Sequence, residues 1–178
     1  TEVALKTRVM ILLIGVLVHK FINFSLPFSG GCKLGRRTIM PHVYALENFG
    51  IKVKIKRGKY EVSRKKLKPG GNIVLYESGD TTTENALLAA SLISGKTVIK
   101  FASANYQVQD LCYFLTGLGI KITGIGTTTL TIQGKKEISK NFSFFLTEDP
   151  IEAMFFLAAA AVTKSSIKIK RCPIDFLE

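Results

Sequence analysis

The sequence predicts an α/β protein in which sheets face outward around a bundle of apolar helices. Three observations lead to this prediction. A pattern of helices and strands recurs along the 178 residues, three helical stretches are apolar on every side, and 47% of the residues are hydrophobic while 21% are charged. That composition is typical of globular proteins with an ordinary core. Helices that are hydrophobic all round are expected to be buried on all sides.

The repeat becomes visible when equivalent segments are aligned. Residues 50–53 (GIKV) match residues 119–122 (GIKI) at an offset of 69, and Glu84 matches Glu152 at an offset of 68. An internal period is a strong architectural signal, because each unit must bury its faces against the others. The chain is therefore expected to be a tandem of βαβαββ units, of which the first is cut at its start and the last at its end.

Apolar periodicity, strand-like alternation and Gly or Pro punctuation define the expected elements. The first unit should contain a helix over 3–14 ending near Gly15, a strand over 21–26, a helix over 40–49 and a hairpin of 51–55 with 60–62. The second should contain a strand over 72–76, a helix over 84–94, a strand over 97–101, a helix over 107–118 and a hairpin of 120–123 with 130–132. The third should begin with a helix from Pro150 and continue into a strand over 167–169. The stretches expected to be buried on all sides are 9–18, 86–93 and 153–162.

The net charge is +12, from 25 Lys and Arg against 13 Asp and Glu. Such a balance favours an anionic partner, which could be nucleic acid, an anionic membrane or phosphorylated small molecules. It is also compatible with a lysine-rich surface that only serves solubility. The one dense run, Arg64-Lys65-Lys66, has no interleaved aromatic residues, so nucleic acid is the weaker option.

The cysteines and histidines exclude several kinds of site. Three Cys without C-x-x-C spacing predict neither a disulfide framework nor a zinc site. Reduced thiols in a cytoplasmic protein are the simplest account. Two His are too few for a His-based metal cluster, so no metal is expected.

The apolar run from Val9 to Val18 is well short of the ~20 residues needed to span a bilayer, so no membrane partner is expected.

The loop Gly30-Gly31-Cys32-Lys33-Leu34-Gly35-Arg36-Arg37 has the residues of an active-site loop. Glycines allow backbone to approach a ligand closely, arginines match phosphate oxygens two at a time, and cationic neighbours lower the pKa of a thiol. On residue types alone, a small buried hydrophobe beside a turn is the competing interpretation.

A helix, a strand, the pattern GGCxxGxR, a helix, a hairpin and then T-E-N-x-L-L-A-A at 83–90 form a recognisable combination. Over essentially the whole chain it resembles the UDP-N-acetylglucosamine enolpyruvyl transferases of the enolpyruvyl transferase family. The resemblance implies an inside-out α/β barrel fold in two domains that close over the substrates. It also implies transfer of the enolpyruvyl group of phosphoenolpyruvate to the 3′-hydroxyl of UDP-N-acetylglucosamine, with release of phosphate, at the first committed step of peptidoglycan synthesis.

The same resemblance implies the organisation and partners of the chain. Residues 1–148 correspond to most of the first domain, with the Cys loop at 28–38, and residues 149–178 begin a third repeat that returns toward the second domain. The expected partners are the two substrates and that second domain, which these residues do not include. No cofactor, nucleic acid or membrane is expected, and the expected location is the cytoplasm. Without the second domain, the 178-residue chain is expected to be inactive.

By resemblance, Cys32 is the catalytic proton donor, which can form a covalent adduct and is the residue that fosfomycin alkylates. The residues expected to bind substrate are Arg8, Arg37, Thr38, Ile39, Met40, Pro41, Glu77, Ser78, Gly79 and Asp80. His42 and Asp149 are further candidates.

Among the departures from the family pattern, three bear most on the nucleotide site. Met40 replaces an Asp, Glu77 replaces a Lys, and Asp80 adds a carboxylate where a pyrophosphate is expected. These changes keep open the alternative of a diverged homologue without catalytic activity. A basic nucleic-acid-binding module remains the third hypothesis, supported only by the net charge.

Overall fold

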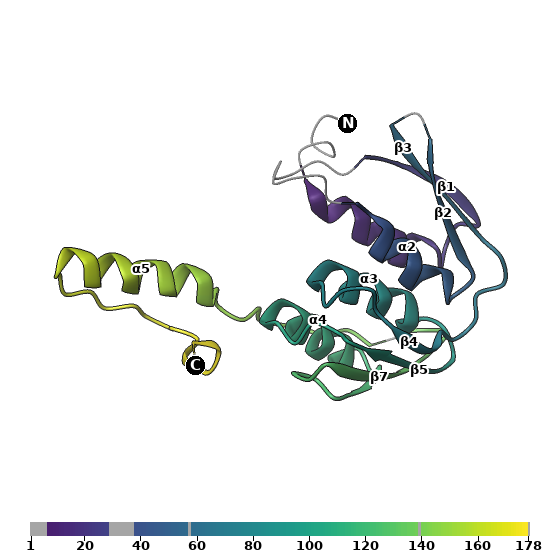
Figure 1. Ribbon diagram of the computed structural model, residues 1–178. Helices are drawn as coiled ribbons and strands as arrows, with labels where there is room; N and C mark the ends of the chain where they lie inside the picture. Colours follow the sequence, from purple (N-terminus) through teal and green to yellow (C-terminus); the bar gives the residue numbers. More distant parts are fainter. Residues whose placement is uncertain (1–6, 29–37, 57, 139, 178) are drawn as a thin grey trace. The chain divides into compact units, whose positions relative to one another are not determined.

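The computed structural model describes residues 7–28, 38–56, 58–138 and 140–177 (Figure 1). The chain divides into two compact units, Thr1–Phe142 and Ser143–Glu178, which are described separately below. The assignment of residues 1–148 and 149–178 to two family domains stays a prediction. None of the helices in the described residues is long and apolar enough to cross a membrane.

The first unit contains two sheets. The first sheet has the order β1-β3-β2 and is antiparallel throughout, with β1 (Asn23–Pro27), β2 (Ile51–Lys56) and β3 (Lys59–Arg64). The second has the order β4-β5-β7-β6, with β4 (Gly71–Val74), β5 (Gly95–Lys100), β6 (Lys121–Thr123) and β7 (Thr129–Gly134). Its β4–β5 pair is parallel and the other two pairs are antiparallel.

The helices of this unit lie between the two sheets (Figure 1). They are the 3-10 helix η2 (Arg8–Leu12), α1 (Leu13–Leu17), α2 (Met40–Glu47), α3 (Asp80–Ser91) and α4 (Tyr106–Gly117). α3 is central, since it contacts η2, α1, α2, α4 and the strands β5 and β7. The core is one cluster that joins both sheets through these helices, with Phe49, Leu87 and Ile132 fully buried. The predicted arrangement of outer sheets and inner apolar helices is therefore confirmed.

The second βαβαββ repeat, which lies within the first compact unit, is complete. Its elements follow the predicted order, as β4-α3-β5-α4-β6-β7. Several boundaries differ from the prediction. The first described helical turns start at Arg8 and run through Gly15 to Leu17, because the buried side of Gly15 packs against α3 and so does not end the helix. α3 begins at Asp80, ahead of the predicted residue 84, since the polar residues 80–83 form its first turn.

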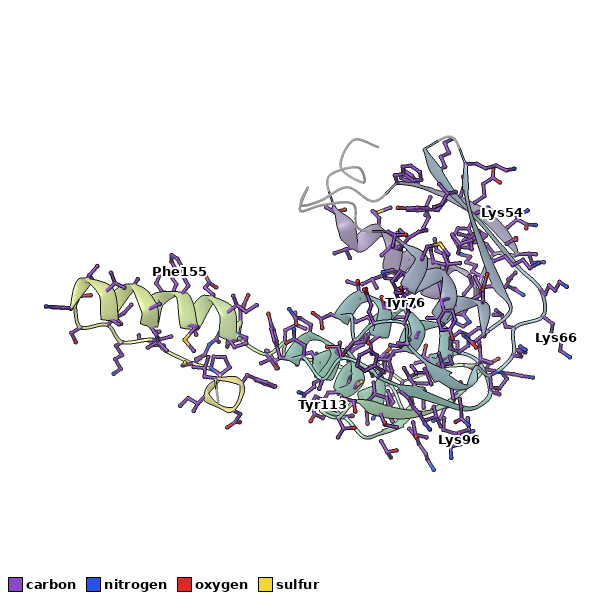
Figure 2. All side chains as sticks on the ribbon, viewed as in Figure 1. Lys54, Lys66, Tyr76, Lys96, Tyr113 and Phe155 are labelled. Carbon is purple, nitrogen blue, oxygen red and sulfur yellow. The ribbon has the colours of Figure 1, made fainter. Side chains whose placement is uncertain are left out.

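Three expectations are wrong, two about buried apolar helices and one about a strand. The stretch 9–18 is not buried on all sides, since Val9 and Val16 are exposed while Ile11 and Ile14 face the core. In the second unit, α5 (Pro150–Thr163) buries Pro150 and Ala153, but most of its apolar side chains are exposed, including Phe155 (Figure 2). Residues 167–169 form no strand, because no other strand lies among the described residues of that unit to pair with them.

A buried amide joins the first helical segment to α3. The carbonyl of Ile11 and the N–H of Gly15 are the two groups that one α-helical hydrogen bond would connect. The side chain of Asn85, fully buried on α3, bridges them: the Gly15 N–H donates to Oδ1 at 2.8 Å, and Nδ2 donates to the Ile11 carbonyl at 3.1 Å. A side chain inserted into a helical ladder changes the helix locally. The helix is accordingly of 3-10 form before this point and α-helical after it.

Gly15 makes this close approach possible. A Cβ at residue 15 would lie 2.5 Å from Oδ1 of Asn85 and 2.6 Å from its backbone carbonyl oxygen. Nearby, Nε2 of His19 lies 3.2 Å from the Leu88 carbonyl oxygen, and burial lowers the pKa of the imidazole. The neutral ring therefore donates this hydrogen bond in the folded state, which gives the segment a second attachment to α3.

Gly15→Ala should destabilise the protein by about 1–3 kcal/mol, because the added methyl group forces the helices apart. Helix propensity alone predicts the opposite sign, since Ala in a helix is favoured over Gly by roughly 0.5–1 kcal/mol. Urea unfolding measures the difference. Val16→Ala, at an exposed position of the same helix, should stay within about 0.5 kcal/mol. An unchanged or increased stability of Gly15→Ala would show that the Asn85 bridge does not depend on the glycine.

Candidate functional site

The candidate site lies where the parallel strands β4 and β5 end. The chain after β4 leads through residues 75–79 into α3, and the chain after β5 leads through residues 101–105 into α4. Loops at the carboxyl ends of parallel strands are the usual place for ligands in α/β proteins. Three of the predicted substrate-binding residues, 77–79, are in the first of these connections, and a fourth, Asp80, is the first residue of α3.

Asp80 links the connection after β4 to the connection after β5 through hydrogen bonds. Its Oδ1 accepts a hydrogen bond from Ser103 Oγ at 2.5 Å, and its Oδ2 accepts one from Asn105 Nδ2 at 3.1 Å. The Ser103 N–H donates to Thr83 Oγ1 at 3.0 Å, and that hydroxyl donates to the Gly79 carbonyl at 2.8 Å. Both carboxylate oxygens therefore have protein partners. The predicted contact of Asp80 with substrate stays a prediction.

The remaining residues of the predicted 77–80 segment surround the start of α3. Ser78 Oγ donates to the Ala102 carbonyl at 3.2 Å, which adds a third link between the connections. Gly79 is the N-cap residue and supplies no side-chain cap. Glu77 is exposed. The first-turn N–H groups at such an end favour an anion.

The segment that follows the Cys loop meets α3 through His42. Thr38 Oγ1 accepts a hydrogen bond from the Met40 N–H at 3.2 Å at the start of α2, where Pro41 is buried and Met40 is exposed. Asn85 Nδ2 lies 3.2 Å from Nδ1 of buried His42, and His42 Nε2 lies 3.5 Å from Thr81 Oγ1.

The Asn85 contacts fix the tautomer of His42. Oδ1 of Asn85 faces a backbone donor and Nδ2 faces a backbone acceptor, so the orientation of the amide is determined. Nδ1 of His42 must then accept, which leaves the proton on Nε2, toward Thr81. The structure thus brings the predicted segments 38–42 and 77–80 together at the N-terminal ends of α2 and α3.

Several predicted residues cannot be placed at this site. Cys32 and Arg37, with Arg36 beside them, lie outside the described residues. Arg8 begins η2, but its side chain is not among those described. Asp149 belongs to the second unit, where its Oδ1 accepts hydrogen bonds from the N–H groups of Ile151 at 2.8 Å and Glu152 at 3.3 Å and so caps α5. The catalytic and substrate-binding roles of all these residues stay predictions.

Cys112, one of the two described cysteines, differs from a reactive thiol. Cys112 is fully buried in the core, as predicted, and burial raises the pKa of its thiol to about 12. It is therefore an inert core residue. Within the described ranges, no group of three His, Cys, Asp or Glu side chains could hold a metal ion.

Sequence reasoning missed the residues that hold the site together. Asn85 stands in the T-E-N motif, but nothing in its spacing indicated a bridge to Ile11 and Gly15. Ser103 and Asn105 follow a strand as short polar residues, and Asn105 caps α4 by accepting the Tyr106 N–H at 2.8 Å. The preference of Asn for N-cap positions is a signal that could have placed the helix start at Tyr106 in place of the predicted residue 107, but no local signal indicates the contact with Asp80.

We expect the contact between Asp80 and Ser103 to stabilise the unit. Asp80→Ala should cost about 1.5–3 kcal/mol, as is typical of hydrogen bonds to a charged group. Ser103→Ala should cost less, and the double variant should cost less than the sum, because both changes remove one interaction. Urea unfolding of the four proteins gives the coupling energy. A coupling energy of zero would show that the hydrogen bond between Ser103 and the Asp80 carboxylate does not stabilise the connection after β5.

Glu84→Gln should stabilise the protein near neutral pH. Burial, together with the charge of Asp80 one turn before it, raises the pKa of Glu84. A raised folded-state pKa means that the stabilisation from protonated Glu84 is fully present below the unfolded value of about 4.5 and is lost as pH rises through the folded value. The difference between the variant and the parent should therefore be small at acidic pH and grow on the way to pH 7.

Unfolding at several pH values tests this expectation. Glu77→Gln removes a charge from an exposed side chain at the same end of α3, and should change stability by no more than about 0.5 kcal/mol. A pH-independent effect of Glu84→Gln would contradict the argument from burial.

Comparison with known proteins places this geometry in a family. The sequence profile of the EPSP synthase (3-phosphoshikimate 1-carboxyvinyltransferase) family matches residues 6–178. The chain is 40% identical over 169 residues to a UDP-N-acetylglucosamine 1-carboxyvinyltransferase of Chlorobium phaeovibrioides, covering 94% of this chain and 40% of that protein. It is 41% identical over 169 residues to a protein of the same name from Campylobacter hominis, with the same coverage. The chain thus spans about two fifths of the length of these relatives.

Solved structures share the fold at low sequence identity. The enolpyruvyl transferase NikO from Streptomyces tendae superposes with a TM-score of 0.70 at 20% identity, covering 84% of this chain and 36% of NikO. The EPSP synthase of Acinetobacter baumannii superposes with a TM-score of 0.63 at 19% identity, covering 86% of this chain and 34% of that enzyme. With a profile match over nearly all its residues and the same fold, the chain belongs to the EPSP synthase family of enolpyruvyl transferases.

Proposed function

We propose that this chain carries part of an enolpyruvyl transferase that uses phosphoenolpyruvate and UDP-N-acetylglucosamine. Membership of the family and the reaction after which its relatives are named support the reaction type. The single structural observation that carries the proposal is the contact of His42 with Thr81, which places residues 38–42 beside residues 77–80. Two helix N-terminal ends at one place suit a ligand with several anionic groups, as a diphosphate sugar has.

The proposed chemistry is an addition followed by an elimination. Cys32 donates a proton to the methylene carbon of phosphoenolpyruvate, which makes the neighbouring carbon electrophilic. The 3′-hydroxyl of the sugar adds there and loses its proton. Phosphate then leaves, and loss of a proton from the new methyl group restores the double bond. An acid in a closing loop suits this sequence, because water would compete with the sugar hydroxyl.

The other predicted residues are proposed to bind and orient. Arg37 binds phosphate, Arg8 contacts the nucleotide sugar, and the segments 38–41 and 77–80 line the UDP-sugar site. His42 holds Thr81, and Asp149 remains a candidate where a second domain would meet the first. We also infer a cytoplasmic location and a role in peptidoglycan synthesis from the substrates.

Phosphate release from the two substrates tests the proposal, with the complete reading frame that contains this chain and with the 178 residues alone. The longer protein should turn over, and the chain alone should not. Cys32→Ser should lower turnover by about 100-fold or more, as for loss of a general acid. Cys172→Ser, in the second unit, is the matched control and should retain activity.

Two results would contradict the proposal. Turnover by the 178 residues alone would show that they need no further domain. Absence of UDP-N-acetylglucosamine binding and of Cys32 alkylation by fosfomycin in the longer protein would favour the diverged, non-catalytic homologue. Met40 and Glu77 would then be the first positions to restore to the family residues.

A further inference from the structure

The positive charge of the chain is concentrated on the first sheet and the connection that follows it. The described residues from 51 to 68 contain eight Lys and Arg and one Glu, so their net charge is +7. This is more than half of the net charge of +12 of the whole chain. Seven exposed lysines of this stretch are called the basic face here. They are Lys52, Lys54, Lys56, Lys59, Lys65, Lys66 and Lys68.

Strand register places the first four lysines on one side of the sheet. Alternate residues of β2 point to opposite faces, and Ile51 is fully buried on the core side. Lys52 and Lys54 therefore point outward, opposite Ser63 and Glu61 of β3. The outer positions of β1 add only neutral Asn23 and Ser25 beside them.

The charge of this face is largely uncompensated. Of its seven lysines, only Lys56 has an ion pair with another described residue, Glu61, whose Oε2 lies at 3.2 Å. Lys56 also stands directly opposite Lys59 in the register. Like charges in that position destabilise a sheet, so the face retains an arrangement that an anionic ligand would relieve.

Two exposed apolar side chains precede β1, but they do not belong to the basic face. Phe21 is 43% exposed and Ile22 is 59% exposed. The Ile22 carbonyl accepts a hydrogen bond from the Arg64 N–H at 2.9 Å, and Arg64 is the register partner of Ile51, which faces the core, so Ile22 lies on that side of the sheet. The Phe21 ring lies 6.4 Å from the ring of Phe24, which packs against the core. The outward positions of the sheet are therefore polar or charged.

We propose that the basic face binds the surface of a membrane that contains anionic phospholipids. Lysines are point charges on flexible stems, so they adapt to headgroups at variable spacing. Among its described residues, the lysine face carries no aromatic side chain, and the guanidinium of Arg64 beside it is hydrogen-bonded to the carbonyls of Phe21 and Lys65. Those residues therefore offer nucleic-acid bases no free ring or guanidinium on which to stack. The short run Val9–Val18 excludes only spanning, not surface binding.

The two sheets of the first unit offer a matched comparison. Figure 2 shows Lys54 and Lys66 projecting from the side of the first sheet, whereas Lys96 projects from the second sheet. Both sheets carry exposed lysines, so charge can be removed in equal amount from either one. The proposal is independent of the enolpyruvyl transferase activity, because binding is measured without substrates.

The experiment is co-sedimentation of the 178-residue chain with vesicles of phosphatidylcholine, with and without phosphatidylglycerol, at about 0.1 M and about 0.5 M salt. The chain should bind only the anionic vesicles and be released by salt. The variant Lys52→Gln/Lys54→Gln/Lys59→Gln/Lys66→Gln should bind about 100-fold or more weakly, since each lysine near an anionic surface contributes about 5-fold. The control Lys96→Gln/Lys100→Gln/Lys121→Gln/Lys135→Gln loses the same charge and should bind within about 3-fold of the parent.

An oligonucleotide at the same salt separates a nucleic acid from a membrane. The chain should bind it more weakly than the anionic vesicles. Equal loss of vesicle binding in the two quadruple variants would overturn the proposal, since net charge would then suffice. It would also be overturned if anionic vesicles were not bound, or if the oligonucleotide were bound more tightly than the vesicles.

Discussion

The side-chain amide of Asn85 bridges two backbone groups of a neighbouring helix, Ile11 C=O and Gly15 N–H, and the arrangement of the first unit depends on that bridge. A fully buried amide must have its donors and acceptor satisfied, because an unpaired one costs about 1–3 kcal/mol. Only one placement of the first helical segment against α3 satisfies it, and Gly15 is what permits that placement. The remaining Nδ2 proton reaches His42, so the same residue also positions α2.

The candidate site is built on this frame. His42 connects α2 to the start of α3, and Asp80 connects the start of α3 to the chain after β5. Asp80 would be unfavourable near a substrate phosphate if its charge were free, but Ser103 and Asn105 donate to both of its oxygens. Asp80 departs from the family pattern, but its carboxylate is hydrogen-bonded within the protein. Glu77 also departs from the pattern, and its side chain is exposed.

Charge is segregated within the first unit. Lysines occupy the outer faces of the sheets, while Glu77, Asp80 and Glu84 gather at the N-terminal end of α3. The segregation follows from topology, because alternate strand residues must face solvent whenever the other face packs on helices. It gives the first unit cationic outer sheet faces and a more acidic N-terminal end of α3.

The sequence by itself determined the βαβαββ order, the outward sheets and the family. The spacing of hydrophobic residues and the positions of glycines are local signals for helices, strands and turns. Because the same signals recur in successive repeats, the assignment in each repeat supports the assignment in the others. Only the tertiary structure decided the contacts across the repeat, such as Asn85 with Gly15, 70 residues apart, and Asp80 with Ser103. It also decided that α5 exposes most of its apolar side chains and that residues 167–169 form no strand. The periodicity of a segment shows which of its faces is suited to burial or to strand pairing. Whether that face is buried or paired depends on a second element, which the periodicity does not identify.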